Sequence, residues 1–292
     1  MRFLLVSDLH YALQQYDWTA SVASEFDAVV IAGDHLDGHS SVDGGVQIVV
    51  LLKVLQRMMG RTRLFVSSGN HDLDSRDGGG ERVARWMEKV RALGIATDGD
   101  SLVLPGTRGP GEEIDPFGPP ALRDTLVTVC PWWDGECARK KVGGQISRDF
   151  ARKREDRAIG TWAWVYHAPP SGSPTCWDGK KHYGDAALIK WIEFYQPDLV
   201  FTGHIHQAPF CAAGSWVDRI GKTWIFNSGR QPGPQPAHIV VDTAAREAAW
   251  FSLKGAEGAQ LDQPLTRPLA ALTAPPAWLP VLPGQVAGTA RV

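Results

Sequence analysis

The sequence lacks the features that mark secreted or membrane-spanning proteins. Its 292 residues include only four cysteines, Cys130, Cys137, Cys176 and Cys211. None of them forms a Cys-x-x-Cys pair, so we expect free thiols rather than disulfides or a structural zinc site. No apolar run approaches the ~20 residues of a membrane span, and residues 2–6 have the character of a core strand rather than a signal peptide. We therefore expect a cytoplasmic protein with no membrane partner.

An excess of positive charge is also missing. The 30 basic and 32 acidic residues give a formal net charge of −2, so no global basic field exists to attract nucleic acid. We do not expect a nucleic-acid partner, and a homo-oligomer is left open. With 43% hydrophobic residues, the chain can bury a full core.

Short apolar strands alternate with helical patterns in the first half of the chain. Residues 2–6, 28–32 and 64–66 have the character of buried strands, and apolar residues recur at helical spacing over residues 43–59. This alternation favours a mostly parallel sheet, in which ligand sites lie beyond the carboxyl ends of the strands. Beyond residue 254 the chain becomes rich in proline and alanine. We therefore predict a catalytic domain over residues 1–254 and an extended C-terminal tail over residues 255–292.

Polar residues follow the strands where each one ends. The central case is the strand over residues 64–66, which stops at two serines and a glycine and is followed by Asn70, His71 and Asp72. Burial alone gives no reason to place an amide, an imidazole and a carboxylate there. Four other apolar strands end in the same manner, and the metal-capable residues at the five strand ends are Asp8, His10, Asp34, Asn70, His71, His167, His204 and His206.

The types of these side chains indicate which metals they would bind. Carboxylate, imidazole and amide oxygen without thiolate suit borderline to hard divalent ions such as Mn, Fe, Zn, Co or Ni. So many ligands exceed what one ion takes and suit two ions that share a carboxylate. Two such ions can clamp a phosphoryl group and activate water at neutral pH.

Five motifs follow one another along the chain: Asp-Leu-His, Gly-Asp, Gly-Asn-His-Asp, a lone strand-end histidine and Gly-His-Ile-His. In this order they resemble the calcineurin-like metallophosphoesterase superfamily over roughly residues 1–253. The Gly-Asn-His-Asp form and the compact core are similar to the branch that includes class III cyclic-nucleotide phosphodiesterases. The resemblance implies an α/β fold, a four-layer α/β/β/α sandwich of two mixed sheets flanked by helices. It also implies two divalent ions (Mn, Fe or Zn). Asp8, His10 and His206 would hold the first ion, Asn70, His167 and His204 the second, and Asp34 would bridge them.

The implied activity is hydrolysis of a small phosphodiester, with nucleotides among the candidates, by a metal-bridging hydroxide. His71 would stay free of metal and protonate the leaving oxygen, and Asp72 would orient or charge its ring. The alternatives are a phosphomonoesterase or pyrophosphate-cleaving hydrolase of the same superfamily and, from another class, a non-catalytic metal-binding scaffold. The scaffold interpretation predicts lost ligands, and none is missing.

Residues for substrate binding are harder to select. His35 follows Asp34 directly, where an apolar residue is the expectation for the family. Arg230 follows Asn227-Ser228-Gly229, where its guanidinium could meet phosphate oxygens. We take both as candidates. Several tryptophans in loop-like stretches are candidates for a binding mouth, namely Trp132, Trp133, Trp177 and Trp216.

Overall fold

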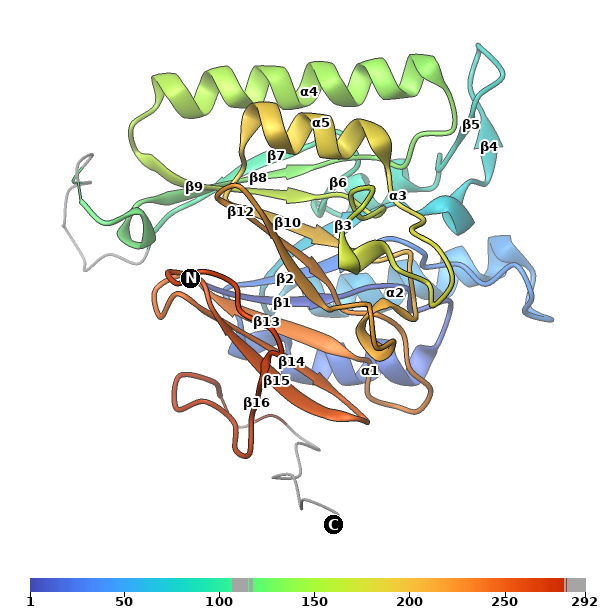
Figure 1. Ribbon diagram of the computed structural model, residues 1–292. Helices are drawn as coiled ribbons and strands as arrows, with labels where there is room; N and C mark the ends of the chain where they lie inside the picture. Colours follow the sequence, from blue (N-terminus) through green and yellow to red (C-terminus); the bar gives the residue numbers. More distant parts are fainter. Residues whose placement is uncertain (107–114, 116–117, 281, 283–292) are drawn as a thin grey trace.

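The computed structural model describes residues 1–106, 115, 118–280 and 282. Its strands form two large sheets packed face to face (Figure 1). The first sheet, in its described part, has the order β16 (Ala270–Ala271), β15 (Gly255–Gln260), β14 (Glu247–Ser252), β13 (His238–Asp242), β1 (Arg2–Val6), β2 (Ala28–Ala32), β3 (Arg63–Ser67) and β6 (Ala96–Thr97). The second has the order β11 (Val217–Ile220), β12 (Thr223–Asn227), β10 (Leu199–Thr202), β9 (Ile159–Val165), β8 (Asp124–Val129) and β7 (Ser101–Leu104). A small hairpin of β4 (Ser75–Arg76) and β5 (Arg82–Val83) projects separately.

Both sheets are mixed, as predicted. In the first sheet β1, β2, β3 and β6 are parallel, whereas β13 to β16 are antiparallel. In the second sheet β8, β9, β10 and β12 are parallel, with β7 and β11 antiparallel at its edges. The carboxyl ends of β1, β2 and β3 therefore lie at one edge of the first sheet, and those of β9 and β10 lie together in the second.

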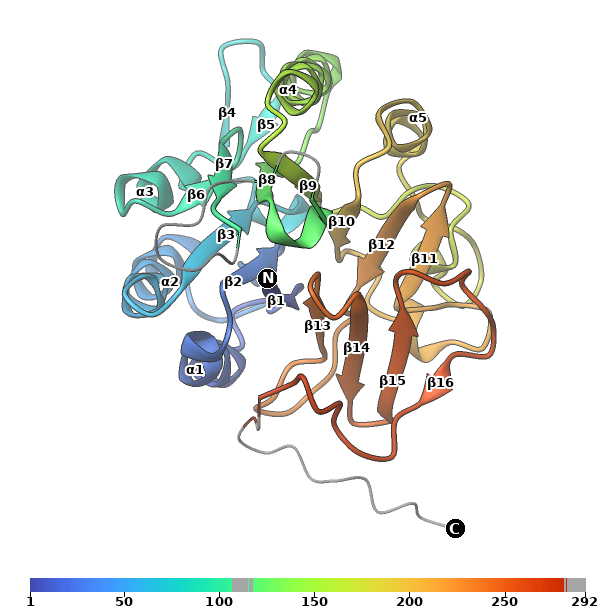
Figure 2. The same ribbon diagram turned by 90° about the vertical axis from the view of Figure 1, so that its left-hand side faces the viewer.

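Helices cover the outer face of each sheet (Figures 1 and 2). The helices α1 (Leu13–Val22), α2 (Gly44–Met59) and α3 (Met87–Ala92) pack on the first sheet, and α4 (Glu136–Glu155) and α5 (Ala186–Tyr195) pack on the second. The predicted four-layer α/β/β/α sandwich is confirmed.

Strand β1 shows why the central strands have almost continuous apolar sequences. Its alternate side chains enter two different cores. Phe3 and Leu5 are buried between the two sheets, and Leu4 and Val6 are buried beneath the helices. A strand that is buried on both faces has no position for a solvated side chain, so polar residues appear only where it ends.

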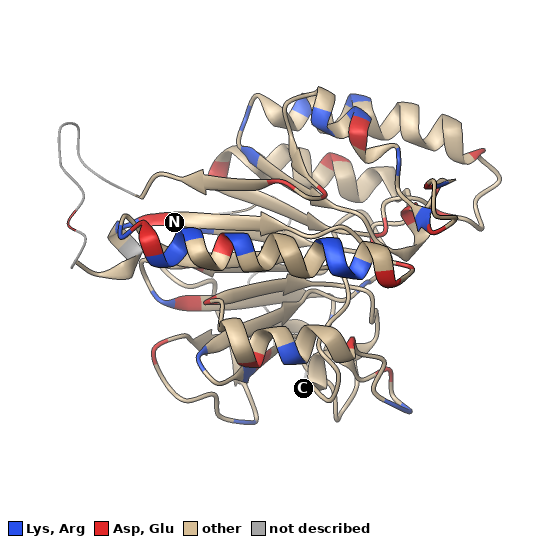
Figure 3. Ribbon diagram, turned by 90° about the horizontal axis from the view of Figure 1, so that it is seen from above, with Lys and Arg blue, Asp and Glu red and all other residues tan. Residues whose placement is uncertain are grey.

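The sequence pattern predicts a helix over roughly residues 147–159. The observed helix α4 begins earlier, at Glu136. Its buried residues Val142, Gln145, Ile146 and Asp149 have helical spacing, but two of the four are polar and Gly143 and Gly144 interrupt the pattern. Gly143 lies so close to α5 that a Cβ there would be 3.3 Å from Trp191 Cζ2. The outer side of α4 carries repeated Lys and Arg residues (Figure 3). Among the described residues, no helix has both the length and the apolar character needed to cross a bilayer.

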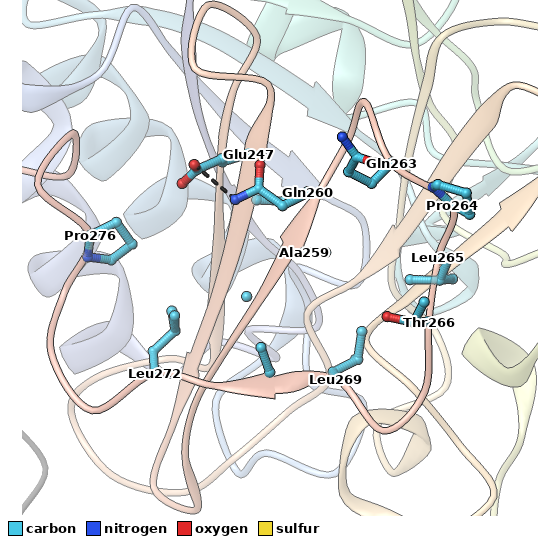
Figure 4. A pocket seen from close by; sticks show the side chains of 13 residues that line it. Glu247, Ala259, Gln260, Gln263, Pro264, Leu265, Thr266, Leu269, Leu272 and Pro276 are labelled. Carbon is cyan, nitrogen blue, oxygen red and sulfur yellow. Dashed lines mark hydrogen bonds between the residues drawn. The ribbon is translucent and has the colours of Figure 1, made fainter.

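The segment after residue 254 starts as a strand of the first sheet. Strand β15 pairs with β14 along its whole length. Farther on, Leu279 and Leu282 are buried in the core between the first sheet and its helices, which we call the helix-side core. A cavity of about 410 Å³ lies between β15 and the following loop, with Leu265, Leu269 and Leu272 in its wall (Figure 4). The division after residue 254 stays a prediction, and residues 281 and 283–292 of the predicted tail lie outside the described residues.

Candidate metal centre

Six of the seven strand-end residues predicted as ligands come together where the two sheets meet. Two groups of side chains place ligand atoms within 4.8 Å of one another. Asp34, which follows β2, belongs to both groups. The first group consists of Asp8, His10, Asp34 and His206, and the second of Asp34, His167 and His204. A carboxylate common to two groups is the arrangement that a bridging ligand requires.

In the first group, the side chains converge from β1, β2 and the loop after β10. His10 Nε2 lies 3.1 Å from His206 Nε2 and 3.7 Å from Asp34 Oδ2, and His206 Nε2 lies 3.3 Å from Asp8 Oδ1. His10 Nδ1 donates a hydrogen bond to the Leu36 carbonyl over 3.2 Å, which directs the lone pair of Nε2 toward the cluster.

In the second group and at Asn70, a buried polar atom lacks a hydrogen-bond partner among the described residues. His167 Nδ1 donates to the Ala32 carbonyl over 2.7 Å, so Nε2 points inward, 3.3 Å from Asp34 Oδ2. Within the part of the chain that the structure describes, His167 Nε2 and Asn70 Oδ1 are buried and have no hydrogen-bond partner. Buried polar atoms are rarely left unsatisfied, and a lone pair facing a carboxylate is satisfied by a cation. The residues therefore fit a divalent metal.

Strained backbone holds the ligands in place. Asp8, His10, Asp34 and His204 all have positive φ, between 39° and 67°. A non-glycine residue rarely adopts this conformation unless its surroundings impose it, and such residues concentrate at functional sites.

Two glycines beside the ligands leave room for close approach. A Cβ at Gly33 would lie 2.3 Å from His167 Nδ1, and one at Gly69 would lie 2.2 Å from Asp34 Oδ1. Both distances are shorter than any tolerable contact. The glycine of each Gly-Asp and Gly-Asn motif is thus required for the packing of the neighbouring ligand.

The charges of the cluster suit a cation. Burial lowers the pKa values of His10 and His204 to about 4, so both rings are neutral near pH 7. Burial acts in the opposite direction on Asp34, but His167 outweighs it and holds the pKa of the carboxyl well below its usual range. Burial would also lower the pKa of His167, yet the Asp34 and Asp8 carboxylates raise it to about 9. A proton at His167 thus occupies the place where a metal would contribute the positive charge.

His71 lies beside the cluster with its ring exposed. The ring centroid is 4.8 Å from that of His10, at 85° between the planes. The predicted pairing with Asp72 is wrong, because the buried Asp72 carboxylate accepts backbone N–H bonds from His35, Leu36 and Gly69, at 2.8–3.0 Å. These bonds tie the loop after β2 to the loop after β3, so Asp72 positions the two loops.

His35 is not available to a substrate, contrary to the sequence-based interpretation. Its side chain is fully buried, with Nδ1 accepting from the Tyr16 hydroxyl and Nε2 donating to the Ser67 carbonyl, each over 2.9 Å. The residue turns into the helix-side core because Asp34 before it has positive φ and turns toward the cluster. It therefore supports the ligand loop from behind.

Arg230 lies close to the centre. Its backbone N–H donates to the His206 carbonyl over 3.2 Å, its side chain is exposed, and its charge contributes to the lowered pKa of His10. Among the tryptophans, Trp216 belongs to the core between the sheets and is no part of a binding mouth. Trp132 approaches the ligands, with its ring 5.2 Å from His204 and 5.6 Å from His167. Its place in a Pro-Trp-Trp-Asp stretch after a strand was the only signal for it.

Comparison with known proteins decides the family. The family model described as calcineurin-like phosphoesterase matches residues 1–208. The chain belongs to this family. Its fold is similar to the crystal structure of TT1561 of Thermus thermophilus, with a TM-score of 0.51 and 12% identity over 89% of this chain and 98% of that one. A dimetal phosphatase from Danio rerio matches with a TM-score of 0.47 and 12% identity over 86% of this chain and 95% of that chain. No curated protein gave a significant match.

Proposed function

We propose that this calcineurin-like phosphoesterase hydrolyses small phosphodiesters with two divalent ions. The observation that carries the proposal is Asp34, whose carboxylate belongs to both ligand groups. One group also holds His167 Nε2, which is buried and has no hydrogen-bond partner among the described residues. Asp8, His10 and His206 would hold one ion and Asn70, His167 and His204 the other. When bound, such ions supply Lewis acidity and positive charge to a phosphoryl group.

The chain's own groups would then orient the ester and move a proton. His71 has an exposed imidazole next to His10, so it can reach the oxygen of a leaving alcohol and protonate it. Arg230 can donate to non-bridging phosphoryl oxygens from the solvent side. Asp72 acts indirectly, because its three backbone bonds hold the loops of Asp34 and His71 together.

The test is hydrolysis by metal-stripped protein reloaded with Mn or Zn. We expect no turnover without metal, and restored turnover of bis(p-nitrophenyl) phosphate in excess over p-nitrophenyl phosphate. Preference for the monoester would replace the phosphodiesterase proposal by the phosphomonoesterase alternative. Two bound ions without activity on either ester would favour the non-catalytic scaffold. The identity of the ions (Mn, Fe or Zn) and the cytoplasmic location stay predictions, and a homo-oligomer stays open.

A further inference from the structure

A cavity of about 470 Å³ opens beside the metal centre and shares two of its ligands. His167 and His204 form part of its wall, together with the aromatic side chains of Trp132, Trp133 and Tyr183. Trp132 and Trp133 are half-buried, and Tyr183 is 47% exposed. A phosphorus atom held at the centre therefore has a largely aromatic surface within reach of one of its substituents.

The backbone position of Trp132 is tied to the ligand loops. Its N–H donates to Ser68 Oγ over 2.9 Å, and Ser68 immediately precedes the Gly-Asn-His-Asp motif. Its ring packs at 46° to the His204 ring. The indole and the proposed ligands His167 and His204 thus line one cavity, so a group stacked there lies beside the centre.

Trp133 is held by a chain of hydrogen bonds. Its Nε1 donates to the Tyr166 hydroxyl, which in turn donates to the Asp185 carboxylate. Asp185 also caps helix α5 by accepting from the Ala187 N–H over 2.6 Å. An indole fixed in this manner is a pre-organised stacking surface.

The charges of the cavity argue against a second phosphate. Asp134 and Asp185 line it, and no Lys or Arg does so among the residues described. Lys181 Nζ lies 4.0 Å from the centroid of the Tyr183 ring, where it covers one face of the tyrosine. Aromatic walls with carboxylates at the edge suit a flat, uncharged group that carries hydrogen-bond donors.

His71 lines a different cavity, of about 830 Å³, formed largely by the polar loop over residues 36–45. If His71 protonates the leaving oxygen, the leaving group lies in that polar cavity, and the substituent in the aromatic cavity is the one that stays on phosphorus. Water supplies the hydroxyl that joins phosphorus, the bond from phosphorus to the leaving oxygen breaks, and that oxygen takes the proton. The product is a monoester that keeps its aromatic group.

On the basis of the proposed activity, we propose that the substrate is a phosphodiester whose retained substituent is a flat aromatic group, such as a nucleoside base, stacked between Trp132, Trp133 and Tyr183. This inference separates the two ester classes, because a group can be retained in the cavity only if a second ester bond is present. It also gives the Trp-Trp pair a role in specificity.

The test uses substrates with one leaving group and different retained groups. Thymidine 5′-(p-nitrophenyl phosphate) should exceed methyl p-nitrophenyl phosphate in kcat/KM by about 10-fold or more, the scale of stacking a single base. In Trp133→Ala this ratio should fall toward one, and Trp133→Phe should restore much of it. Trp278→Ala, at a half-buried tryptophan that does not line the cavity, should leave the ratio unchanged. Phenyl p-nitrophenyl phosphate shows whether a ring alone suffices or a base is needed.

Failure of this inference can be told apart from failure of the proposed activity. Metal-dependent hydrolysis of all three esters at equal kcat/KM would overturn the aromatic subsite and leave the phosphodiesterase intact. If none is hydrolysed by the metal-loaded protein, the proposed activity fails, and binding decides the subsite. Thymidine 5′-monophosphate should then bind at least about 10-fold more weakly to Trp133→Ala in calorimetry, and equal binding would overturn the subsite as well.

Discussion

The backbone N–H of His71 donates a hydrogen bond to Asp34 Oδ1 over 2.9 Å, while Asp34 Oδ2 lies 3.3 Å from His167 Nε2. One oxygen of the shared carboxylate thus positions the proposed acid, and the other faces the ligands. The proposed proton donor and the proposed metal ligands are therefore connected, so changes to either should be detectable at the other.

Replacing Asp34 by Asn should remove the charge that both ligand groups share. We expect the bound metal to fall from two ions to one or none. We expect kcat/KM to fall at least about 100-fold, which is more than the loss of a residue that only hydrogen-bonds to a metal ligand causes. Elemental analysis and steady-state kinetics measure the two quantities. Asp17→Asn is the control, because Asp17 is exposed on α1, belongs to neither group and lines neither cavity beside the centre. Two tightly bound ions in Asp34→Asn would refute the bridging role.

Replacing His71 by Ala should keep both metals and slow turnover by about 10²–10⁴-fold, the range for loss of a general acid. The loss should be largest for esters with poor leaving groups, since good ones depart without protonation. The control is His39→Ala, at a side chain that is 91% exposed and belongs to neither ligand group. Loss of metal from His71→Ala would make His71 a ligand.

Replacing Asp72 by Ala should leave three buried backbone N–H groups without their acceptor. The free energy of unfolding should fall by about 3 kcal/mol or more, since each unsatisfied donor is costly. Urea denaturation of the metal-free protein measures it. Asp74→Ala is the control, because the exposed Asp74 accepts one backbone bond, from Arg85, and should cost less than about 1 kcal/mol. Unchanged stability with an altered pH–rate profile would instead restore the predicted pairing with His71.

His238 should make the protein less stable in acid. Burial lowers its pKa to about 4 from an ordinary 6.5; its Nδ1 donates to the Pro236 carbonyl, and its ring stacks on Phe251. Between these pKa values the unfolded chain binds more protons than the folded one, so stability falls as pH falls from 6.5 toward 4. Over pH 7.5 to 5 the loss is about 2 kcal/mol.

His238→Phe should remove this part of the pH dependence. Denaturation at both pH values, with wild type and variant compared at each, isolates it from the other titrating groups. If the free energy of unfolding changes with pH by the same amount in both proteins, His238 is hydrated and titrates normally.

The proposed ligands could be predicted from the sequence more reliably than the roles of the residues around them. Asp8, Asp34 and His204 could be selected because a buried parallel strand allows polar side chains only at its end, so each marks the carboxyl end of a strand. His35 and Asp72 are polar residues of the same motifs, but their side chains turn away from the site. For His35 the cause is the positive φ of Asp34, and for Asp72 it is the approach of the two loops, neither of which the sequence pattern contains. The start of α4 was missed because Gly143 is selected by contact with Trp191, a long-range cause that local pattern does not contain.

Strand β1 lies between β2 and β13, and its antiparallel pairing, Leu5 with Ile239, joins segments that are far apart in the chain. During synthesis one edge of β1 therefore stays open long after the strand has left the ribosome, exposed to incorrect pairing and to chaperones. Asp8 and His10 extend from this strand. The last proposed ligand is His206, but β1 gains its second neighbour only when β13 has been made. A chain that ends between them would carry every proposed ligand while one edge of this central strand stays unpaired.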